Sequence, residues 1–208
     1  GIVEDEGLIN EVVPGAFKTY NTDQMLIVEN GDASFLVCPE GEVGNNEYLD
    51  PHSREAVQFD QITRKVRGTR DASGEFSGAY EEYRTALQDA LDAYVEDHYE
   101  FGTGCCYNTQ NGVILAISAS KFEPRNFWTG RWRSVWTCTF EPGQAVALSG
   151  EARIAVHFYE DGNVQLNATH TLPAKAKGGS PGATAKAVLK AILNAENKYQ
   201  QALETAYA

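Results

Sequence analysis

The chain has 208 residues, 42% of them hydrophobic, which is enough to build the core of one large domain or two small ones. Its 29 acidic and 17 basic residues give a net charge of −12, which argues against a general nucleic-acid binder, because phosphate binding requires an excess of lysine and arginine. No apolar run approaches the roughly 20 residues that span a bilayer, and the N-terminus lacks the features of a signal peptide. We therefore expect a soluble, cytoplasmic protein without membrane insertion.

The first third of the chain predicts a weak helix followed by a small β-rich region. Residues 1–24 have a weak helical pattern, which we expect Pro14 to interrupt, because proline lacks the backbone N–H that a helix interior needs. Residues 25–66 hold short β-rich runs separated by turns. Residues 67–78 have the composition of a loop.

An amphipathic helix is predicted after this loop, within residues 67–100. Apolar residues recur there at steps of three and four, which places them in one stripe on an α-helix. Ser73 and Ser77 are candidate N-terminal caps. We expect His98, at the C-terminal end, to pack against the helix or to cap it rather than to bind a ligand. The stripe comprises Phe76, Tyr80, Tyr83, Leu87, Leu91, Tyr94 and His98.

Residues 101–173 predict a central antiparallel sheet. Asn111-Gly112 and Asp161-Gly162 each lie between two β-rich runs and suit tight hairpin turns of type I′, in which both central residues have positive φ. Short connections between consecutive strands force antiparallel pairing, so the strands form a meander. The five candidate strands cover residues 101–108, 113–121, 126–140, 147–159 and 163–171.

Residues 174–208 predict a loop and a long C-terminal helix. The segment AKAKGGSPGA precedes an apolar stripe that continues for about six helical turns. The predicted fold class is therefore α+β: a five-stranded antiparallel meander sheet covered by the long C-terminal helix, with a smaller N-terminal β-rich region. The stripe comprises Ala185, Val188, Leu189, Ile192, Ala195, Tyr199, Leu203 and Ala206.

Three tryptophans lie four residues apart in the segment NFWTGRWRSVWTC, a spacing that fits either a helix or one face of a strand. The neighbours favour a strand, because β-branched residues and Gly130 are disfavoured in helices, and because Pro124 and Pro142 bracket the segment. One face of this strand would be strongly apolar, and we expect the helices to bury it. That face carries Trp128, Trp132, Trp136, Cys138 and Phe140.

Arg131 and Arg133 lie on the opposite face of this strand, and their role stays open: they pair with acidic residues, meet a partner or remain solvated. An alternative function uses the tryptophans themselves as an exposed stacking platform. The chain would then be a secreted carbohydrate-binding module, glycosylated at Asn167 in the sequon Asn-Ala-Thr. The acidic composition and the lack of a signal peptide argue against this alternative.

The sequence holds no recognisable catalytic motif, so we expect no enzyme activity, no cofactor and no metal site. There is no P-loop, no complete dinucleotide-binding fingerprint and no nucleophile motif. His157 lies close to Glu160 and Asp161, but on a strand these side chains do not converge on a metal. We expect the cysteines to be reduced and packed in the interior. They are Cys38, Cys105, Cys106 and Cys138.

Two segments resemble the F-actin capping protein α subunit family. The run VHFYEDGNV at residues 156–164 resembles the hallmark segment of that family, and the tryptophan strand resembles the family's strand just upstream. Shorter matches at residues 20–24, 49–51, 93–99 and 194–200 keep the family order along nearly the whole chain. The residues that carry the resemblance are Val156, His157, Phe158, Tyr159, Glu160, Asp161, Gly162, Asn163 and Val164, with Trp128, Gly130, Arg131, Trp132 and Arg133.

The resemblance implies an architecture and a function. Members of this family join two related subunits, α and β, about a pseudo-two-fold axis. Each subunit contributes a five-stranded antiparallel sheet, and a long helix from each lies across the joint sheet. The complex binds actin filament barbed ends and blocks the exchange of actin subunits. We therefore expect the partners to be a capping protein β subunit or a second copy of this chain, and the filament barbed end, in the cytoplasmic actin cytoskeleton.

The resemblance stops short at both ends of the sequence. The family grips actin with a basic C-terminal tail, and this sequence ends at Ala208, before the tail motif. The first stalk helices of the family are not matched either, so residues 1–24 are expected to form a partial stalk helix. We therefore expect the chain to supply the dimerisation scaffold, and we carry over no actin-contact residue.

Overall fold

The computed structural model describes residues 6–140 and 146–207 of the chain. It divides into two compact units, residues 1–75 and residues 76–208. The five segments read from the sequence are a finer division than this one, and their boundaries stay a prediction. Within the described ranges, no helix is long and apolar enough to cross a membrane.

The first unit combines one helix with two small antiparallel sheets. Strands β1 and β2 form a hairpin, and β3 to β6 form a four-stranded sheet in chain order. Phe35, Tyr48 and Phe59 are buried in its core. The elements are α1 (Glu6–Asp23), β1 (Leu26–Asn30), β2 (Ala33–Val37), η1 (Pro39–Gly41), β3 (Glu42–Gly44), β4 (Glu47–Asp50), β5 (Glu55–Asp60) and β6 (Lys65–Asp71).

Two predictions for the first unit are wrong. Helix α1 continues through Pro14, because proline removes only one helical hydrogen bond and the residues after it are held by the unit. Asn21, for example, is buried and donates from Nδ2 to the Gln61 carbonyl at 2.8 Å. Strand β6 occupies part of the predicted loop at 67–78, because it pairs with β5 through its backbone while most of its side chains stay exposed.

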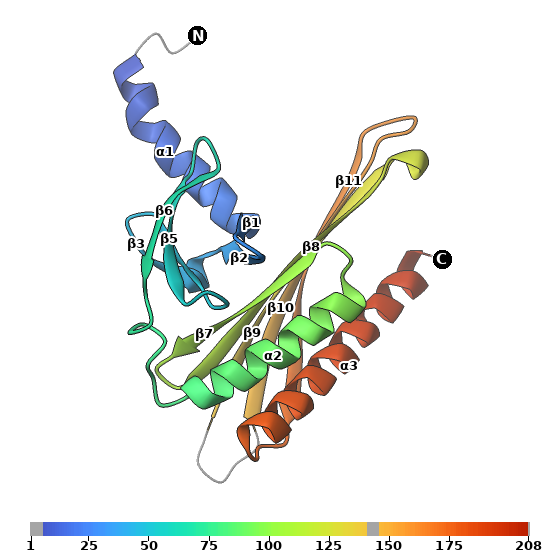
Figure 1. Ribbon diagram of the computed structural model, residues 1–208. Helices are drawn as coiled ribbons and strands as arrows, with labels where there is room; N and C mark the ends of the chain where they lie inside the picture. The colour runs from blue at the N-terminus through green and yellow to red at the C-terminus, as the bar shows by residue number, and fades with distance from the viewer. Residues whose placement is uncertain (1–5, 141–145, 208) are drawn as a thin grey trace. The chain divides into compact units, whose positions relative to one another are not determined.

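The second unit is a five-stranded antiparallel sheet with two helices on one face (Figure 1). The strand order is β11-β10-β9-β8-β7, so the sheet is the meander that the sequence predicts. The elements are α2 (Glu81–His98), β7 (Gly102–Thr109), β8 (Gly112–Glu123), η2 (Pro124–Asn126), β9 (Trp128–Thr139), β10 (Val146–Phe158), β11 (Val164–Ala176) and α3 (Pro181–Tyr207).

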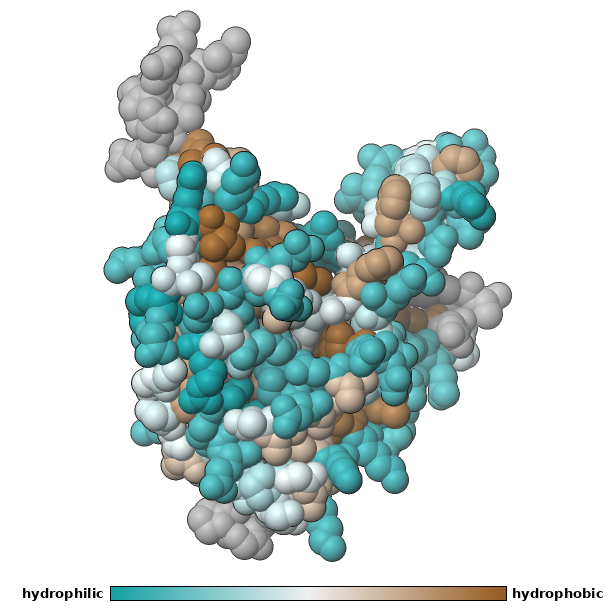
Figure 2. Space-filling view, in the orientation of Figure 1, coloured by the Kyte–Doolittle hydropathy of each residue, from teal (hydrophilic) through white to brown (hydrophobic). Residues whose placement is uncertain are grey.

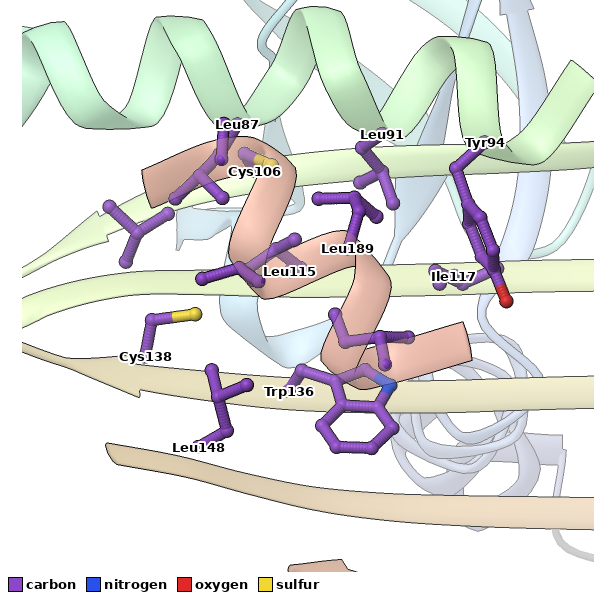
Figure 3. Packing of buried hydrophobic residues seen from close by; sticks show 14 of the residues in the cluster. Leu87, Leu91, Tyr94, Cys106, Leu115, Ile117, Trp136, Cys138, Leu148 and Leu189 are labelled. Atoms are coloured by element: carbon purple, nitrogen blue, oxygen red, sulfur yellow. The ribbon is translucent and has the colours of Figure 1, made fainter. Parts of the chain in front are cut away.

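The two helices bury their apolar stripes against this sheet. Helix α2 packs mainly on β7, and α3 packs on β11 and β10. Leu87 and Leu91 of α2 lie with Leu189 of α3 between the helices and the sheet (Figure 3). The ring of Trp136 lies so close to Gly150 that an added Cβ there would come within 2.5 Å of it. The predicted cover of the sheet by a C-terminal helix is therefore confirmed.

The start of α2 differs from the prediction. The helix begins at Glu81, and the residue before it, Tyr80, makes no capping hydrogen bond with its side chain. Neither Ser73 nor Ser77 is therefore the cap. Phe76 precedes the helix and is nevertheless buried, so its place in the apolar pattern reflects packing rather than helical periodicity.

The turn between β7 and β8 lies one residue earlier than predicted. Gln110 and Asn111 form it, because Thr109 pairs with Gly112 across the hairpin. Both turn residues have negative φ, so the turn is not of type I′. Glycine is required at Gly112 for another reason: an added Cβ would lie 1.9 Å from the carbonyl oxygen of Cys138 on β9.

Candidate subunit interface

Strand β9 carries the tryptophans, which confirms the strand interpretation. Trp132 and Trp136 are 9% and 0% exposed on the face that the helices cover. This burial contradicts the alternative of an exposed stacking platform for carbohydrate. Trp128 lies on the same face by alternation but is only partly buried, so the prediction of a fully buried face is wrong at this end. The reason is that β9 continues past the helices.

The two arginines of β9 differ in exposure. Arg133 is 7% exposed and stands opposite Arg153 on β10 and Ser118 on β8, so it is not a solvated residue. Like charges directly opposite each other repel, and the Glu151 carboxylate, 3.7 Å from Arg153 Nε, offsets part of this repulsion. Arg131 is exposed and contributes to the rim of a cavity at the end of α2.

The hallmark segment, residues 156–164, forms the far end of the β10–β11 hairpin. Val156 and Phe158 end β10, and Val164 begins β11 and pairs with Phe158. The predicted type I′ turn at Asp161-Gly162 is wrong, because neither residue has positive φ. The connection is a five-residue irregular loop from 159 to 163 instead.

Two hydrogen bonds hold this loop to its surroundings. His157 Nε2 lies 2.7 Å from Asn163 Oδ1, across the hairpin. The backbone N–H of Tyr159 donates to the Phe127 carbonyl at 2.8 Å, and the two rings meet edge to face with centroids 6.1 Å apart. Phe127 has a φ of 55°, an uncommon value for a bulky residue, and through its contacts with Tyr159 the β8–β9 and β10–β11 ends meet in one tip.

The described residues contain no metal-ligand cluster and no exposed thiol. No three His, Cys, Asp or Glu side chains of the described ranges are grouped to hold a metal ion. All four cysteines are free and buried. Burial raises the pKa of Cys138 to about 12, so its thiol stays protonated and unreactive near neutral pH.

The far part of the sheet extends past the end of α2 as an arm, which we define as residues 120–131 and 155–167 (Figure 1). On the side where the helices lie, its side chains are mostly apolar and only partly covered. Phe158 is 37% exposed and Val164 is 63% exposed. Figure 2 shows apolar atoms in brown among the polar atoms of the arm. We call this surface the arm face; it comprises Trp128, Gly130, Val156, Phe158, Val164 and Leu166, with the charged pair Lys121 and Glu123 of β8 at its border.

A cavity of about 280 Å³ lies where the arm begins, beside the end of α2. Ala119, Trp132 and Ile154 give it an apolar floor, and polar residues form its rim. His98 lies on this rim as the predicted packing and capping residue, because its Nδ1 is 2.9 Å from the Tyr94 carbonyl and its ring stacks on Tyr94. The rim comprises His98, Tyr99, Glu100, Lys121 and Arg131.

The outer edge of the sheet is β11, which has a strand neighbour on one side only in the described structure. The second half of α3 lies along this edge, and a surface cavity of about 390 Å³ lies between them. The rings of Tyr199 and His170 stack across it, with centroids 4.5 Å apart. Ala202 on the same side of α3 is exposed. The second half of α3, the open edge of β11 and the arm face thus form one region with little cover.

Comparison with known proteins identifies the family. The family model described as F-actin capping protein alpha subunit matches residues 1–208. The chain belongs to this F-actin capping protein α family. It is 37% identical to the F-actin-capping protein subunit alpha of Dictyostelium discoideum, over 100% of this chain and 75% of the relative. It is 33% identical to that of Caenorhabditis elegans, over 100% and 75%. The family read from the hallmark segment and the tryptophan strand is therefore confirmed.

A solved structure shares the fold of this α-family chain. It is the homodimeric actin capping protein alpha subunit from Plasmodium berghei, with a TM-score of 0.86 and 22% sequence identity. The match covers 97% of this chain and 79% of that one. The α+β fold predicted from the strand and helix patterns is therefore confirmed.

Sequence reasoning found the hallmark segment but missed the surface to which it belongs. Val156 and Phe158 flank the polar His157, and Val164 and Leu166 flank Gln165 on the next strand. This pattern predicts one apolar face but does not reveal that the helices stop before covering it. The length of β10, 13 residues, was the available signal, because it exceeds a typical strand.

Proposed function

We propose that the chain is a dimerisation subunit of an actin filament capping complex, which binds barbed ends and blocks the exchange of actin subunits. The observation that carries this proposal is an open sheet edge, β11, next to the partly uncovered arm face. Family membership and relatives named F-actin-capping protein subunit alpha support the actin target. In this role the chain is not an enzyme, needs no cofactor and works in the cytoplasmic actin cytoskeleton.

The edge strand supports a sheet that continues into a second subunit. An exposed edge presents unpaired backbone N–H and C=O groups, and proteins normally cover, twist or shorten such edges. Strand β11 has 13 residues, and its one proline, Pro173, lies near the C-terminal end. Antiparallel pairing with an equivalent strand would satisfy the outward backbone groups of most of this length.

The arm face and α3 support the same assembly through their side chains. A two-fold axis beside β11 would place the second half of α3 from each subunit over the arm of the other subunit. Both contacts would form, because each subunit carries both surfaces. The exposed Ala202 and partly buried Leu203 of α3 would then cover Phe158 and Val164. Burying apolar surface at about 25 cal/mol per Å² gives such an interface its main stabilisation.

The partner in this proposal is a capping protein β subunit or a second copy of the chain. A β subunit of related architecture would present an equivalent edge strand and long helix. The homodimeric Plasmodium berghei protein supports the second copy, because it shares the fold and is an α subunit paired with itself. Three hallmark residues, Val156, Phe158 and Val164, would belong to the interface in either case, since they lie on the arm face.

Actin contacts are expected outside the described surface. The net charge of −12 gives the chain little attraction for an acidic filament end. A basic C-terminal tail of the kind found in the family would supply that attraction. We therefore assign residues 1–208 the scaffold role and expect them to contribute less to barbed-end binding than a basic tail of this kind.

Dimerisation is tested by sedimentation velocity with two variants of adjacent residues on β11. Val164→Asp puts a charge on the arm face, whereas Gln165→Asp puts the same charge on the other face of the strand. We expect the first variant to weaken the dimer at least about tenfold and the second to change it less than about threefold. A wild-type chain that stays monomeric at micromolar concentration, both alone and with a β subunit, would refute the proposal.

The actin target is tested by elongation from filament seeds. The chain is mixed with a β subunit, and growth at the barbed end is followed by fluorescence. We expect the complex of a tailed α subunit with β to stop growth and the 208-residue chain with β to slow it weakly. Equal potency would show that the scaffold itself holds the actin contacts, and no effect from either complex would refute capping.

A further inference from the structure

Glu196 is a buried acidic residue in the middle of an apolar helix stripe. It is 1% exposed and lies on α3 one turn after Ile192, in line with Ala185, Val188 and Leu189. Carboxylates are seldom fully buried, because taking the charge out of water is costly unless strong hydrogen bonds replace the lost hydration. The residue therefore calls for a reason beyond packing.

Four donors converge on its two carboxylate oxygens. The hydroxyls of Tyr94 and Tyr99 donate to Oε2 at 2.6 and 2.8 Å. Ser134 Oγ and Trp136 Nε1 donate to Oε1 at 3.1 and 3.4 Å. The two tyrosines come from the end of α2 and the turn after it, and the other two donors come from β9. One side chain of α3 is thereby hydrogen-bonded to both of the layers around it.

All four donors are neutral groups, so the arrangement is no ion pair. The indole N–H can only donate. Burial, and next the charge of Glu196, raise the pKa of both tyrosine hydroxyls far above the ordinary value, so they also remain donors. A buried polar group of this kind is best known for selecting one register among several that apolar packing alone would allow.

The rest of the α3 stripe provides little selection of register by itself. It is built from alanine, valine, leucine and isoleucine against a sheet, and the small residues leave similar surfaces one turn apart. A shift of α3 by one helical turn moves it about 5.4 Å along its axis. Such a shift would keep much of the apolar contact but would carry the carboxylate of Glu196 away from its four donors.

Both surfaces of the proposed interface connect to this carboxylate. Tyr99, one of its donors, lines the cavity at the base of the arm and lies 6.3 Å from the Trp132 ring, between centroids. Tyr199 follows Glu196 by less than one turn, stacks on His170 of the edge strand and also approaches Trp132 at 6.3 Å. The position of Glu196 therefore sets where the second half of α3 meets β11.

We infer that Glu196 is a positioning residue for subunit assembly: its four hydrogen bonds fix the axial position of α3 on its own sheet, and so place the second half of α3 for the partner subunit. This inference rests on the proposed dimer, but its first test does not require one. Helix position and dimer affinity are measured separately, so the two proposals can fail separately.

The variant that separates position from stability removes the carboxylate together with its two closest donors. In the triple variant Glu196→Leu, Tyr94→Phe, Tyr99→Phe, apolar groups of similar size replace the carboxylate and its two closest donors, so only the Ser134 hydroxyl and the Trp136 N–H lose this acceptor. Glu196→Gln is the conservative control, since it keeps the size and one acceptor oxygen. A Lys186→Gln substitution on the exposed side of α3 controls for a change of charge on the helix.

Helix position is read by spin labels on α2 and α3. Asp89→Cys and Lys190→Cys are both exposed, and the four native cysteines are buried at 0% exposure, so labelling is selective. We expect one narrow distance distribution in wild type and in Lys186→Gln, a broader one in Glu196→Gln, and a second population displaced by about 5 Å in the triple variant. An unchanged narrow distribution in the triple variant would overturn the inference.

Dimer affinity is read by sedimentation in the same variants. We expect the triple variant to dimerise at least about tenfold more weakly than wild type under conditions in which a urea titration shows both chains fully folded. Wild-type affinity in the triple variant would overturn the inference, because the network would then act only in folding and not in assembly. If the triple variant does not fold, the Glu196→Gln variant decides: a narrow distribution with wild-type affinity contradicts the inference, and a broad one with weaker affinity supports it. A wild-type chain that does not dimerise would refute the proposed function instead.

Discussion

The two halves of the five-stranded sheet follow the same alternation of side chains but differ in what covers them. Under the helices, Trp136 is 0% exposed, whereas on the arm Phe158 and Val164 on the same face are 37% and 63% exposed. Apolar residues line this face in both halves, so both are built for burial. The covered half is completed within the chain, and we propose that a partner completes the arm. The difference separates residues that hold the fold from residues that assemble it.

Truncation of a tryptophan in each half of the sheet is expected to give the largest difference in the free energy of unfolding. We expect Trp136→Ala to lower the free energy of unfolding by about 3–5 kcal/mol, because it empties a buried site between sheet and helices. Trp128→Ala, on the partly covered arm, should cost less than about 1.5 kcal/mol in the same urea titration. Equal costs for the two would show that the halves do not differ.

A smaller effect is expected when a methyl group is added to a glycine in each half. Gly150→Ala forces a Cβ to within 2.5 Å of the enclosed Trp136 ring and should cost about 1–3 kcal/mol. Gly130→Ala places a Cβ 3.0 Å from the Trp128 ring, which is partly exposed and free to move aside, so we expect less than about 1 kcal/mol. Thermal unfolding of both variants measures the difference.

The two halves are also expected to differ in the reactivity of a thiol, with almost no change in stability. Burial raises the pKa of Cys138 to about 12, so at pH 8 this thiol is protonated as well as enclosed. Val164→Cys on the arm places a thiol at an exposed site. We expect a thiol reagent to label Val164→Cys within minutes and Cys138 only on unfolding. Protection of Val164→Cys in the presence of a partner would extend the contrast to the complex.

The sequence was sufficient to predict the five-stranded sheet. It was not sufficient to predict how much of the sheet the helices cover. The β-branched neighbours of Trp132 and the short connections identified the strands and their meander, because these signals are local. The exposure of Trp128 depends on where α2 ends relative to the sheet. The continuation of α1 through Pro14 depends on contacts made by residues later in the helix. Neither is encoded in a local pattern, so both predictions were wrong.

Glu196 shows the same limit at a single residue. It lies in the apolar stripe of the C-terminal helix, between Ile192 and Tyr199, and this placement was a readable signal. Its donors come from α2, the following turn and β9, up to 102 residues away in sequence, so no spacing rule connects them. The prediction of a turn at Asn111-Gly112 was wrong for a related reason. Gly112 is required by the close approach of β9, which is distant in sequence, and not by the adjacent turn.

The central claim, that a partner subunit binds along β11 and the arm, is tested most directly by amide hydrogen exchange. The sheet has two edge strands, β11 and β7, and only β11 adjoins the arm face and α3. We expect formation of the complex with a β subunit or a second copy to slow exchange along residues 164–176 strongly and to leave residues 102–109 unchanged. A stable complex that leaves exchange in β11 unaltered, or that protects β7 instead, would contradict the account.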